Sequence, residues 1–192
     1  MTWCVNEVTR PNMSSNICVC VCIASAALAR LGMRCRLLSK VGSDAYATFL
    51  LESLKHVMGV IVDDVISGCT DCVVTTTAFT YVIVCKESMS RTCIHTPLLF
   101  DITHDEVLQN IQQAEFHHDF SYVHFDSRHT ESAVLFAEKI RTSNVFQNYG
   151  MTFSIDLEKP RPYIDNLICY CNIIFTNKKG IKNMFPTFIG ES

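Results

Sequence analysis

Three polar side chains stand where ligands gather in one common class of fold. Asp126, Asp156 and Asn177 each lie at or just beyond the end of a short apolar run. Each run has the composition of a strand, and helix-like segments separate the runs. This alternation implies parallel strands joined by crossover helices, and ligands of such sheets collect at the carboxyl ends of the strands. The spacing therefore predicts an α/β fold with a polar site.

The elements that would position these side chains follow from periodicity and composition. Helices are expected where apolar residues recur at a spacing of three to four, and strands where β-branched and aromatic residues cluster. The predicted helices cover 17–31, 44–56, 104–114, 131–142 and 160–170, and the predicted strands cover 37–42, 73–85, 91–95, 122–126, 151–156 and 172–176. Another extended stretch is predicted to begin at 60–62. Residues 1–16 and 178–192 are expected to be irregular.

Charge and hydropathy limit the class of partner. The 192 residues carry a formal net charge of −3, which gives no electrostatic reason to expect nucleic acid or an anionic membrane surface. No apolar run reaches the roughly 18 residues of a spanning helix. The apolar run 17–29 has the length of a signal-peptide core, but only one basic residue, Arg10, precedes it, and it continues into a helix end at Gly32. We therefore expect neither a nucleic-acid nor a membrane partner.

Eleven cysteines are an odd number in a chain too long for a small disulfide scaffold. Cys85, Cys93 and Cys169 lie inside apolar runs, where cysteine usually behaves as a small buried hydrophobe. These features favour a reducing, cytoplasmic location, with a plastid as the alternative.

Metal and phosphate-loop chemistry find weak support. Cys69 and Cys72 form a single Cys-x-x-Cys pair without a second pair or a fixed histidine spacing. His117, His118 and Asp119 are more typical of a solvated loop. The sequence contains no Gly-x-x-x-x-Gly-Lys-[Ser/Thr] loop, which excludes a P-loop kinase. No metal site is predicted.

Five motifs in order resemble the PfkB-type, ribokinase-like carbohydrate kinases. Residues 27–32 read Ala-Leu-Ala-Arg-Leu-Gly and 38–44 read Leu-Ser-Lys-Val-Gly-Ser-Asp, similar to a helix ending in Ala-Arg-Leu-Gly and a Lys-Val-Gly-x-Asp turn in that family. Segments 79–84, 90–97 and 125–133 resemble a plant-type branch of it. The resemblance extends over roughly three quarters of the chain.

This resemblance implies a parallel sheet flanked by helices with a small β lid at about 73–96, in a fold incomplete at both ends. It implies transfer of the γ-phosphoryl group from ATP, with Mg²⁺, to a hydroxyl of a sugar or related small molecule. Such chemistry needs positioned phosphates, neutralised charge and a base near the acceptor. A homo- or hetero-dimer through the β lid is the expected assembly.

The resemblance assigns substrate-side roles to six residues, and each has an ordinary alternative. These residues are Lys40, Gly42, Asp44, Arg91, Asp126 and Arg128. Asp44 either contacts the substrate or caps a helix, and Arg91 either reaches the substrate from the lid or is an exposed hairpin arginine. Asp126 either contacts sugar or a metal shell or caps the following helix, with Arg128 as a solvated partner.

Two more residues would face the nucleotide or the metal shell. Asp156, with Glu158 and Arg161 nearby, either does so or forms an exposed loop ion pair. Asn177 matches the asparagine that opens the family's Asn-x-x-Glu motif, but Gly180 stands where the motif has glutamate.

Other departures concern catalysis. By spacing, Cys18-Val19-Cys20 replaces the family's Gly-Gly-Asn segment, and residues 1–16 hold no counterpart of the strand that carries a sugar-binding aspartate. The late Gly-Ala-Gly-Asp motif, which supplies the catalytic base and phosphate-holding N–H groups, is absent, so no catalytic residue is predicted. One hypothesis is a truncated or mis-spliced product.

The predicted organisation is an irregular segment at 1–16, a partial kinase domain at 17–177 and an irregular tail at 178–192. The predicted function is ATP-dependent phosphorylation of a sugar-like hydroxyl by descent, impaired in this chain. The alternatives are a non-catalytic partner that binds an intact relative through the lid hairpin, or no function.

Overall fold

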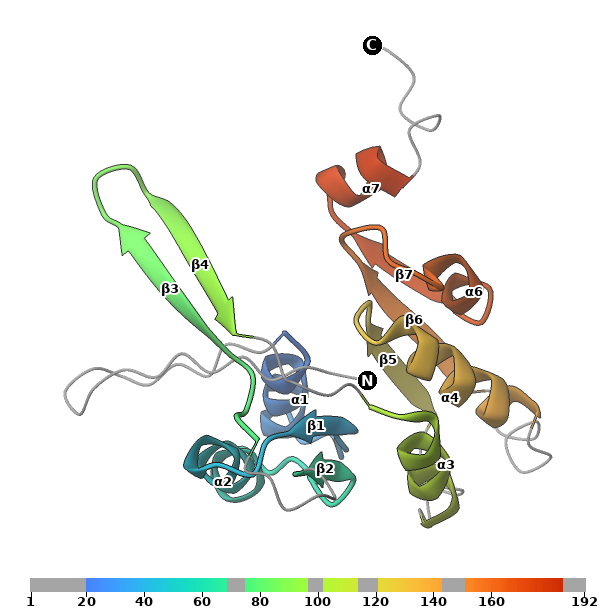
Figure 1. Cartoon of the computed structure of the whole chain (residues 1–192). Helices are drawn as coiled ribbons and strands as arrows, with labels where there is room; N and C mark the ends of the chain where they lie inside the picture. Colours follow the sequence, from blue (N-terminus) through green and yellow to red (C-terminus); the bar gives the residue numbers. More distant parts are fainter. Residues whose placement is uncertain (1–19, 69–74, 97–101, 114–120, 143–150, 185–192) are drawn as a thin grey trace. The chain divides into compact units, whose positions relative to one another are not determined.

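The computed structural model describes residues 20–68, 75–96, 102–113, 121–142 and 151–184 (Figure 1). The chain divides into two compact units, an N-terminal unit up to Asp101 and a C-terminal unit from Ile102. Predictions for residues 1–16, for Cys69 and Cys72, and for 117–119 lie outside the described residues. None of the described helices is long and apolar enough to cross a membrane.

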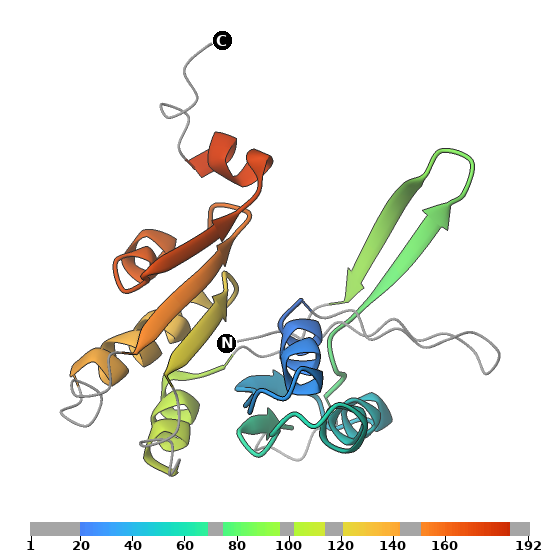
Figure 2. The same ribbon diagram turned by 180° about the vertical axis from the view of Figure 1, so that it is seen from behind.

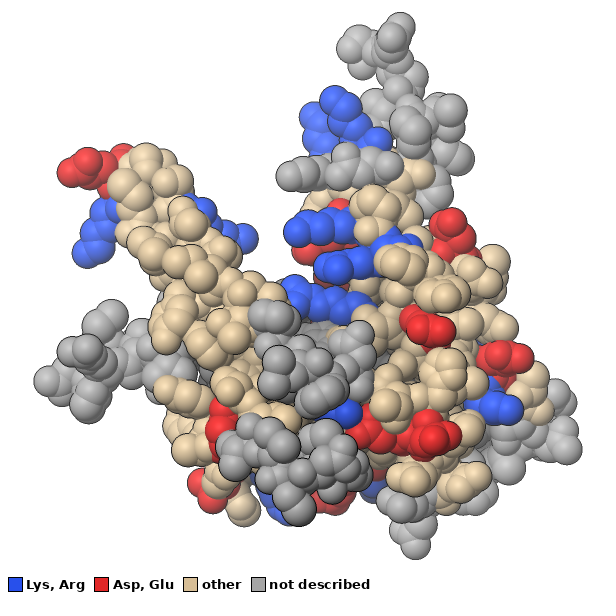
Figure 3. Space-filling model, in the orientation of Figure 1, with Lys and Arg blue, Asp and Glu red and all other residues tan. Residues whose placement is uncertain are grey.

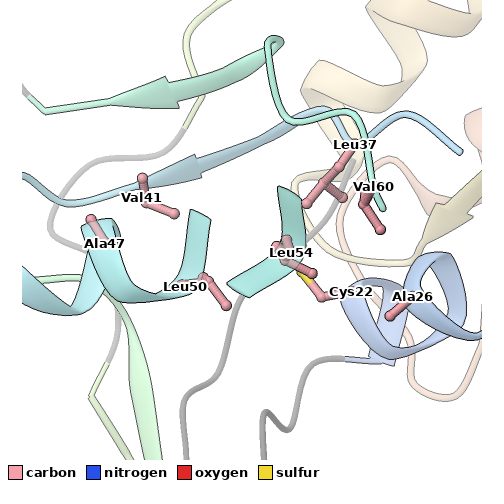
Figure 4. Close-up of a cluster of buried hydrophobic side chains, with 8 residues drawn as sticks. All are labelled: Cys22, Ala26, Leu37, Val41, Ala47, Leu50, Leu54 and Val60. Atoms are coloured by element: carbon pink, nitrogen blue, oxygen red, sulfur yellow. The ribbon is translucent and has the colours of Figure 1, made fainter. Parts of the chain in front are cut away.

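The body of the N-terminal unit packs helices against a short parallel sheet. Its elements are α1 (Cys20–Arg30), β1 (Ser39–Val41), α2 (Ala45–Glu52), the π-helical turn η1 (Ser53–Val57) and β2 (Val65–Ser67). Strands β1 and β2 are parallel, and Ser39 pairs with Val65. Figure 4 shows the core, which consists of Cys22, Ala26, Leu37, Val41, Ala47, Leu50, Leu54 and Val60.

A separate antiparallel hairpin belongs to the same unit. Strands β3 (Phe79–Cys85) and β4 (Ser90–Thr96) pair from Phe79 with Thr96 to Cys85 with Ser90. The hairpin was predicted, although its first strand begins at Phe79 and not at Val73. Residues 75–78 are described but are not part of the strand.

The C-terminal unit is a three-stranded parallel sheet with helices. Its elements are α3 (His104–Gln113), β5 (Tyr122–Asp126), α4 (Thr130–Thr142), β6 (Thr152–Leu157), α6 (Ile164–Ile168), β7 (Ile173–Thr176) and α7 (Lys178–Met184). The strand order is β5-β6-β7, and both pairs are parallel. The predicted alternation of parallel strands and crossover helices is confirmed.

Aromatic packing forms the centre of this unit. Helix α4 buries Ala133, Phe136, Ala137 and Ile140, a spacing of three and four that places them on one helix face. The ring of Phe125 meets Phe136 and Phe153 edge-to-face, with centroids 6.2 and 5.6 Å apart. Phe125 on β5 and Phe153 on β6 are fully buried, so these contacts hold the helix to the sheet.

The extended stretch predicted to begin at 60–62 starts with an isolated bridge of Ile61 to Arg36, and its strand β2 lies at Val65–Ser67. Two local predictions were wrong. Residues 178–184 of the expected irregular tail form α7. Cys85, Cys93 and Cys169, expected to be buried, are exposed.

Candidate functional site

The turn that follows β1 is held by hydrogen bonds to the segment that precedes β3. Asp44 is the N-cap of α2, since its Oδ1 accepts a hydrogen bond of 3.0 Å from the backbone N–H of Ala47. The same carboxylate accepts the backbone N–H of Thr77 at 2.9 Å and the Thr77 hydroxyl at 2.5 Å. The capping interpretation of Asp44 is confirmed, and both carboxylate oxygens are engaged within the protein.

At Gly42 the backbone of the turn lies close to the backbone of residues 75–77. A Cβ atom built on it would lie 2.2 Å from the carbonyl oxygen of Thr75 and 2.5 Å from the backbone nitrogen of Thr77. Its own N–H donates to the Thr77 hydroxyl at 3.1 Å. Lys40 lies on β1 and is buried, with 6% of its surface exposed. Gly42 and Asp44 therefore belong to one packed turn, and Lys40 lies on the strand that leads into it.

Asp126 is the buried acid of the C-terminal unit. It ends β5 with only 7% of its surface exposed, and burial raises the pKa of its carboxyl to about 6. Its Oδ1 accepts the backbone N–H of Arg128 at 3.0 Å, and the Arg128 Nε lies 3.9 Å from Oδ2. Since Arg128 precedes α4, the bond closes an Asx-type turn and does not cap the helix.

Asp156 lies beside Asp126 across the sheet. The two residues are register partners of β5 and β6. Asp156 is half-buried, and burial, followed by the nearby charge of Glu158, raises the pKa of its carboxyl. Its negative charge in turn helps to raise the pKa of Asp126. The predicted convergence of acids at the carboxyl ends of the strands is therefore present for this pair.

Basic side chains follow each strand of the same sheet. They are Arg128 after β5, Lys159 and Arg161 after β6, and Lys178 and Lys182 in α7 after β7. Figure 3 shows Lys and Arg side chains gathered over α7 and the strand ends of this unit. Four of them are exposed and Arg128 is half-buried, so their charges are open to an anionic group in solution.

Asn177 caps the start of helix α7. Its Oδ1 accepts the N–H of Gly180 at 2.8 Å, a capping interaction at the start of the helix. A Cβ atom at Gly180 would lie 2.5 Å from the Thr176 Oγ1 and 2.6 Å from the carbonyl oxygen of Leu157. The close packing at Gly180 leaves no room for the glutamate side chain that the family motif has there.

The magnesium shell implied by the resemblance does not fit these residues. Magnesium takes oxygen ligands, commonly carboxylates, and here Gly180 offers no side chain while the Asn177 oxygen is used as a cap. Within the described ranges, no group of three or more His, Cys, Asp or Glu side chains could hold a metal ion.

Arg91 lies on the hairpin and not in the packed turn of its unit. It is an exposed residue of β4, paired with Val84 near the tip of the hairpin. The structure thus brings together Lys40, Gly42 and Asp44 in the N-terminal unit and Asp126, Arg128 and Asp156 in the C-terminal unit. Sequence reasoning missed Thr75 and Thr77, whose only signal was a run of three threonines at 75–77 in a predicted strand.

Solved structures of sugar kinases have the same fold. A fructokinase from Xylella fastidiosa is 21% identical with a TM-score of 0.57, over 91% of this chain and 58% of that one. A fructokinase from Vibrio cholerae O395 is 11% identical with a TM-score of 0.61, over 94% and 63%. The tetrameric inhibited form of phosphofructokinase-2 from Escherichia coli is 14% identical with a TM-score of 0.60, over 95% and 59%.

The chain has the ribokinase-like fold. This confirms the predicted fold class, and at these identities the likeness concerns the fold. The chain spans about three fifths of the length of these structures, between 58% and 63%. No protein-family model and no curated protein matches the sequence.

Proposed function

We propose that this chain binds a sugar or related small-molecule hydroxyl compound at the carboxyl ends of β5 and β6. We further propose that the chain alone does not transfer the phosphoryl group of ATP at ordinary kinase rates. The observation that carries the first part is Asp126, a buried carboxyl beside Asp156 at the strand ends of a ribokinase-like sheet. Ligands of parallel α/β sheets collect at this edge.

The chemistry of this edge suits a polar, uncharged ligand next to an anionic one. Carboxylate oxygens accept hydrogen bonds from hydroxyl groups, and a carboxyl whose pKa is about 6 exists in both protonation states near neutral pH. The basic residues after the three strands favour an anionic group such as the phosphates of ATP. Displaced pKa values at strand ends are typical of functional sites.

The limit on turnover comes from the residues that phosphoryl transfer requires. Rate acceleration needs backbone donors aimed at the transferring phosphate and a base at the acceptor hydroxyl. The 192 residues contain no Gly-Ala-Gly-Asp segment, and the turn at Asn177 does not fit a magnesium shell. We therefore expect this chain to bind its ligands but not to catalyse phosphoryl transfer.

Thermal unfolding combined with a turnover assay tests both parts. The purified chain is heated alone, with each of a panel of sugars, and with ATP and Mg²⁺, while a coupled assay records ADP release. A ligand that binds only the folded state raises the free energy of unfolding by about 2.7 kcal/mol at one hundred times its Kd, and the midpoint temperature rises with it. We expect a shift with at least one sugar and no sugar-dependent ADP release. Turnover at about 1 s⁻¹ or faster, an ordinary kinase rate, would contradict the second part.

A second candidate function is that of a binding partner acting through the hairpin. Tyr81, Ile83, Val84 and Ile94 are each more than half exposed. A lone two-stranded hairpin is marginally stable in water, so a partner strand or surface would stabilise it. Sedimentation of the wild-type chain and of the Ile83→Lys variant, alone and mixed with an intact sugar kinase of this fold, tests this candidate. Association lost in the variant would support it, and a monomer in every mixture would count against it.

A further inference from the structure

The β3–β4 hairpin extends away from the helices of its own unit. Figures 1 and 2 show it from opposite sides, projecting beyond α1 and α2. Its two strands pair with each other along their whole length and with no other described strand. From Tyr81 to His95 its side chains are exposed, apart from the partly buried Val82. Within the part of the chain that the structure describes, the contacts that can set the orientation of the hairpin lie where the chain enters it.

The entry segment contrasts with the hairpin in burial. Thr75, Thr77 and Ala78 have 3%, 1% and 2% of their surfaces exposed. Threonine is seldom buried so completely unless its polar groups are bonded. The hairpin therefore begins from a buried segment, directly before Phe79.

Five residues of the turn 42–44 and the entry segment 75–77 form hydrogen bonds between the two segments, with donors on each side. The N–H of Ser43 donates to the carbonyl oxygen of Thr75 at 2.9 Å, and the N–H of Thr75 donates to the Ser43 hydroxyl at 3.0 Å. The N–H of Thr77 donates to Asp44 Oδ2 at 2.9 Å, and its hydroxyl donates to Asp44 Oδ1 at 2.5 Å. Gly42 completes the set by donating to the Thr77 hydroxyl at 3.1 Å.

We propose that Asp44 and Thr77 are positioning residues that fix the direction in which the β3–β4 hairpin leaves its unit. We call the segments 42–44 and 75–77 the anchor, because their hydrogen bonds hold the start of the hairpin that follows Ala78. Asp44 acts at this anchor through Thr77 and through the α2 cap, so the helix and the hairpin share one carboxylate. The proposal concerns the anchor and the hairpin of one unit and does not depend on the proposed function.

Charge strengthens the anchor. Burial alone would raise the pKa of Asp44, but the hydrogen bonds from Thr77 and Ala47 outweigh it, so the pKa lies below its ordinary value. The carboxylate is thus charged at neutral pH, and hydrogen bonds to a charged acceptor are stronger than those between neutral groups.

Backbone ¹⁵N relaxation on the full chain tests the proposal. Thr77→Val keeps the shape of the side chain but removes the hydroxyl that Gly42 and Asp44 use. We expect the order parameters of residues 79–96 to fall together from about 0.85 to below about 0.6, while those of α2 stay unchanged. Thr77→Ser restores the hydroxyl and is expected to restore the hairpin values.

A second variant covers the case in which Thr77→Val does not fold. Asp44→Ser keeps a good N-cap for α2 but leaves the Thr77 N–H without its acceptor. The same loss of order confined to the hairpin is expected. Unchanged hairpin values, or an equal loss in α2 and the hairpin, would overturn the proposal. A sugar titration of the wild-type chain tests the proposed function separately, because the relaxation experiment needs no ligand.

Discussion

The turn at Gly42–Asp44 and the strand ends at Asp126 and Asp156 both place acids at or just after the ends of short parallel strands, but the acids differ in their hydrogen bonds and burial. The Asp44 carboxylate is bonded by three N–H or O–H groups, and its pKa is lowered. Asp126 has one backbone donor, is more deeply buried, and its pKa is raised to about 6. A fully bonded acid stabilises the fold, whereas a buried acid with few donors destabilises it and is available to a ligand.

Among the substitutions that test this difference, the largest change in the free energy of unfolding is expected at Gly42. Gly42→Ala would place a methyl group 2.2 Å from the Thr75 carbonyl oxygen, so the backbone of the turn or of the segment 75–77 must move. We expect the free energy of unfolding to fall by about 3 kcal/mol, measured by urea titration. The matched control is Gly59→Ala, where φ is +74° and nothing lies within 4 Å, and about 1 kcal/mol is expected. Equal costs at the two glycines would show that the turn is not closely packed.

Gly180→Glu restores the family's glutamate at the other region. Its Cβ would meet the Thr176 Oγ1 at 2.5 Å and the Leu157 carbonyl oxygen at 2.6 Å, so we expect a loss of about 2.5 kcal/mol. Lys182→Gln changes the net charge by the same amount at an exposed position of α7 and serves as the control. If Gly180→Glu were as stable as the control and its Tm rose with Mg²⁺, this would contradict the conclusion that the Asn177 turn does not fit a magnesium shell.

Asp126→Asn is expected to stabilise the chain by about 2 kcal/mol at pH 7.5. The unfolded carboxyl releases its proton near pH 3.8 and the folded one near 6, so wild-type stability falls as pH rises between these values. The asparagine keeps an acceptor for the Arg128 N–H and has no charge to desolvate. Urea titrations from pH 4 to 8 should show a flatter profile for this variant, while the exposed Glu138→Gln should keep the wild-type slope. A wild-type profile without this fall would contradict the raised pKa.

The smallest expected effect concerns Asp44. Asp44→Ala removes a helix cap and the acceptor of the Thr77 N–H and hydroxyl, and we expect a loss of about 1.5 kcal/mol at pH 7. Because the folded pKa of Asp44 is lowered, its contribution is present above the unfolded pKa near 3.8 and disappears as pH falls through the folded value. The difference between variant and wild type should therefore shrink in strong acid. A difference independent of pH would mean that the charge of Asp44 plays no part.

Local periodicity accounts for what the sequence predicted well. Strand β5 has its predicted bounds, and α4 begins one residue before its predicted start, because both depend on neighbours a few positions away. The Asp44 cap was also a local expectation. The pairing of Asp44 with Thr77 spans 33 residues, and no local pattern predicts which turn meets which segment.

Competition between local propensity and packing explains the errors. Helix α7 contains Gly180, a weak helix former, so composition favoured an irregular tail. The Asn177 cap and the close contact of Gly180 with Leu157 support the helix there. Strand β2 begins at Val65, directly after the buried Asp64, whose carboxylate pairs with Arg36, a contact over 28 residues that no local pattern predicts.

Calorimetric titration of a sugar panel into the wild-type chain and Asp126→Asn decides whether Asp126 contacts a bound sugar. We expect at least one sugar to bind the wild-type chain. We expect the variant, although more stable, to bind it at least about tenfold more weakly, a loss of about 1.4 kcal/mol. Asp44→Ser should bind that sugar within about threefold of wild type, since Asp44 does not contact it. Equal affinity of the wild-type chain and Asp126→Asn, or no binding of any sugar by a folded chain, would contradict the account.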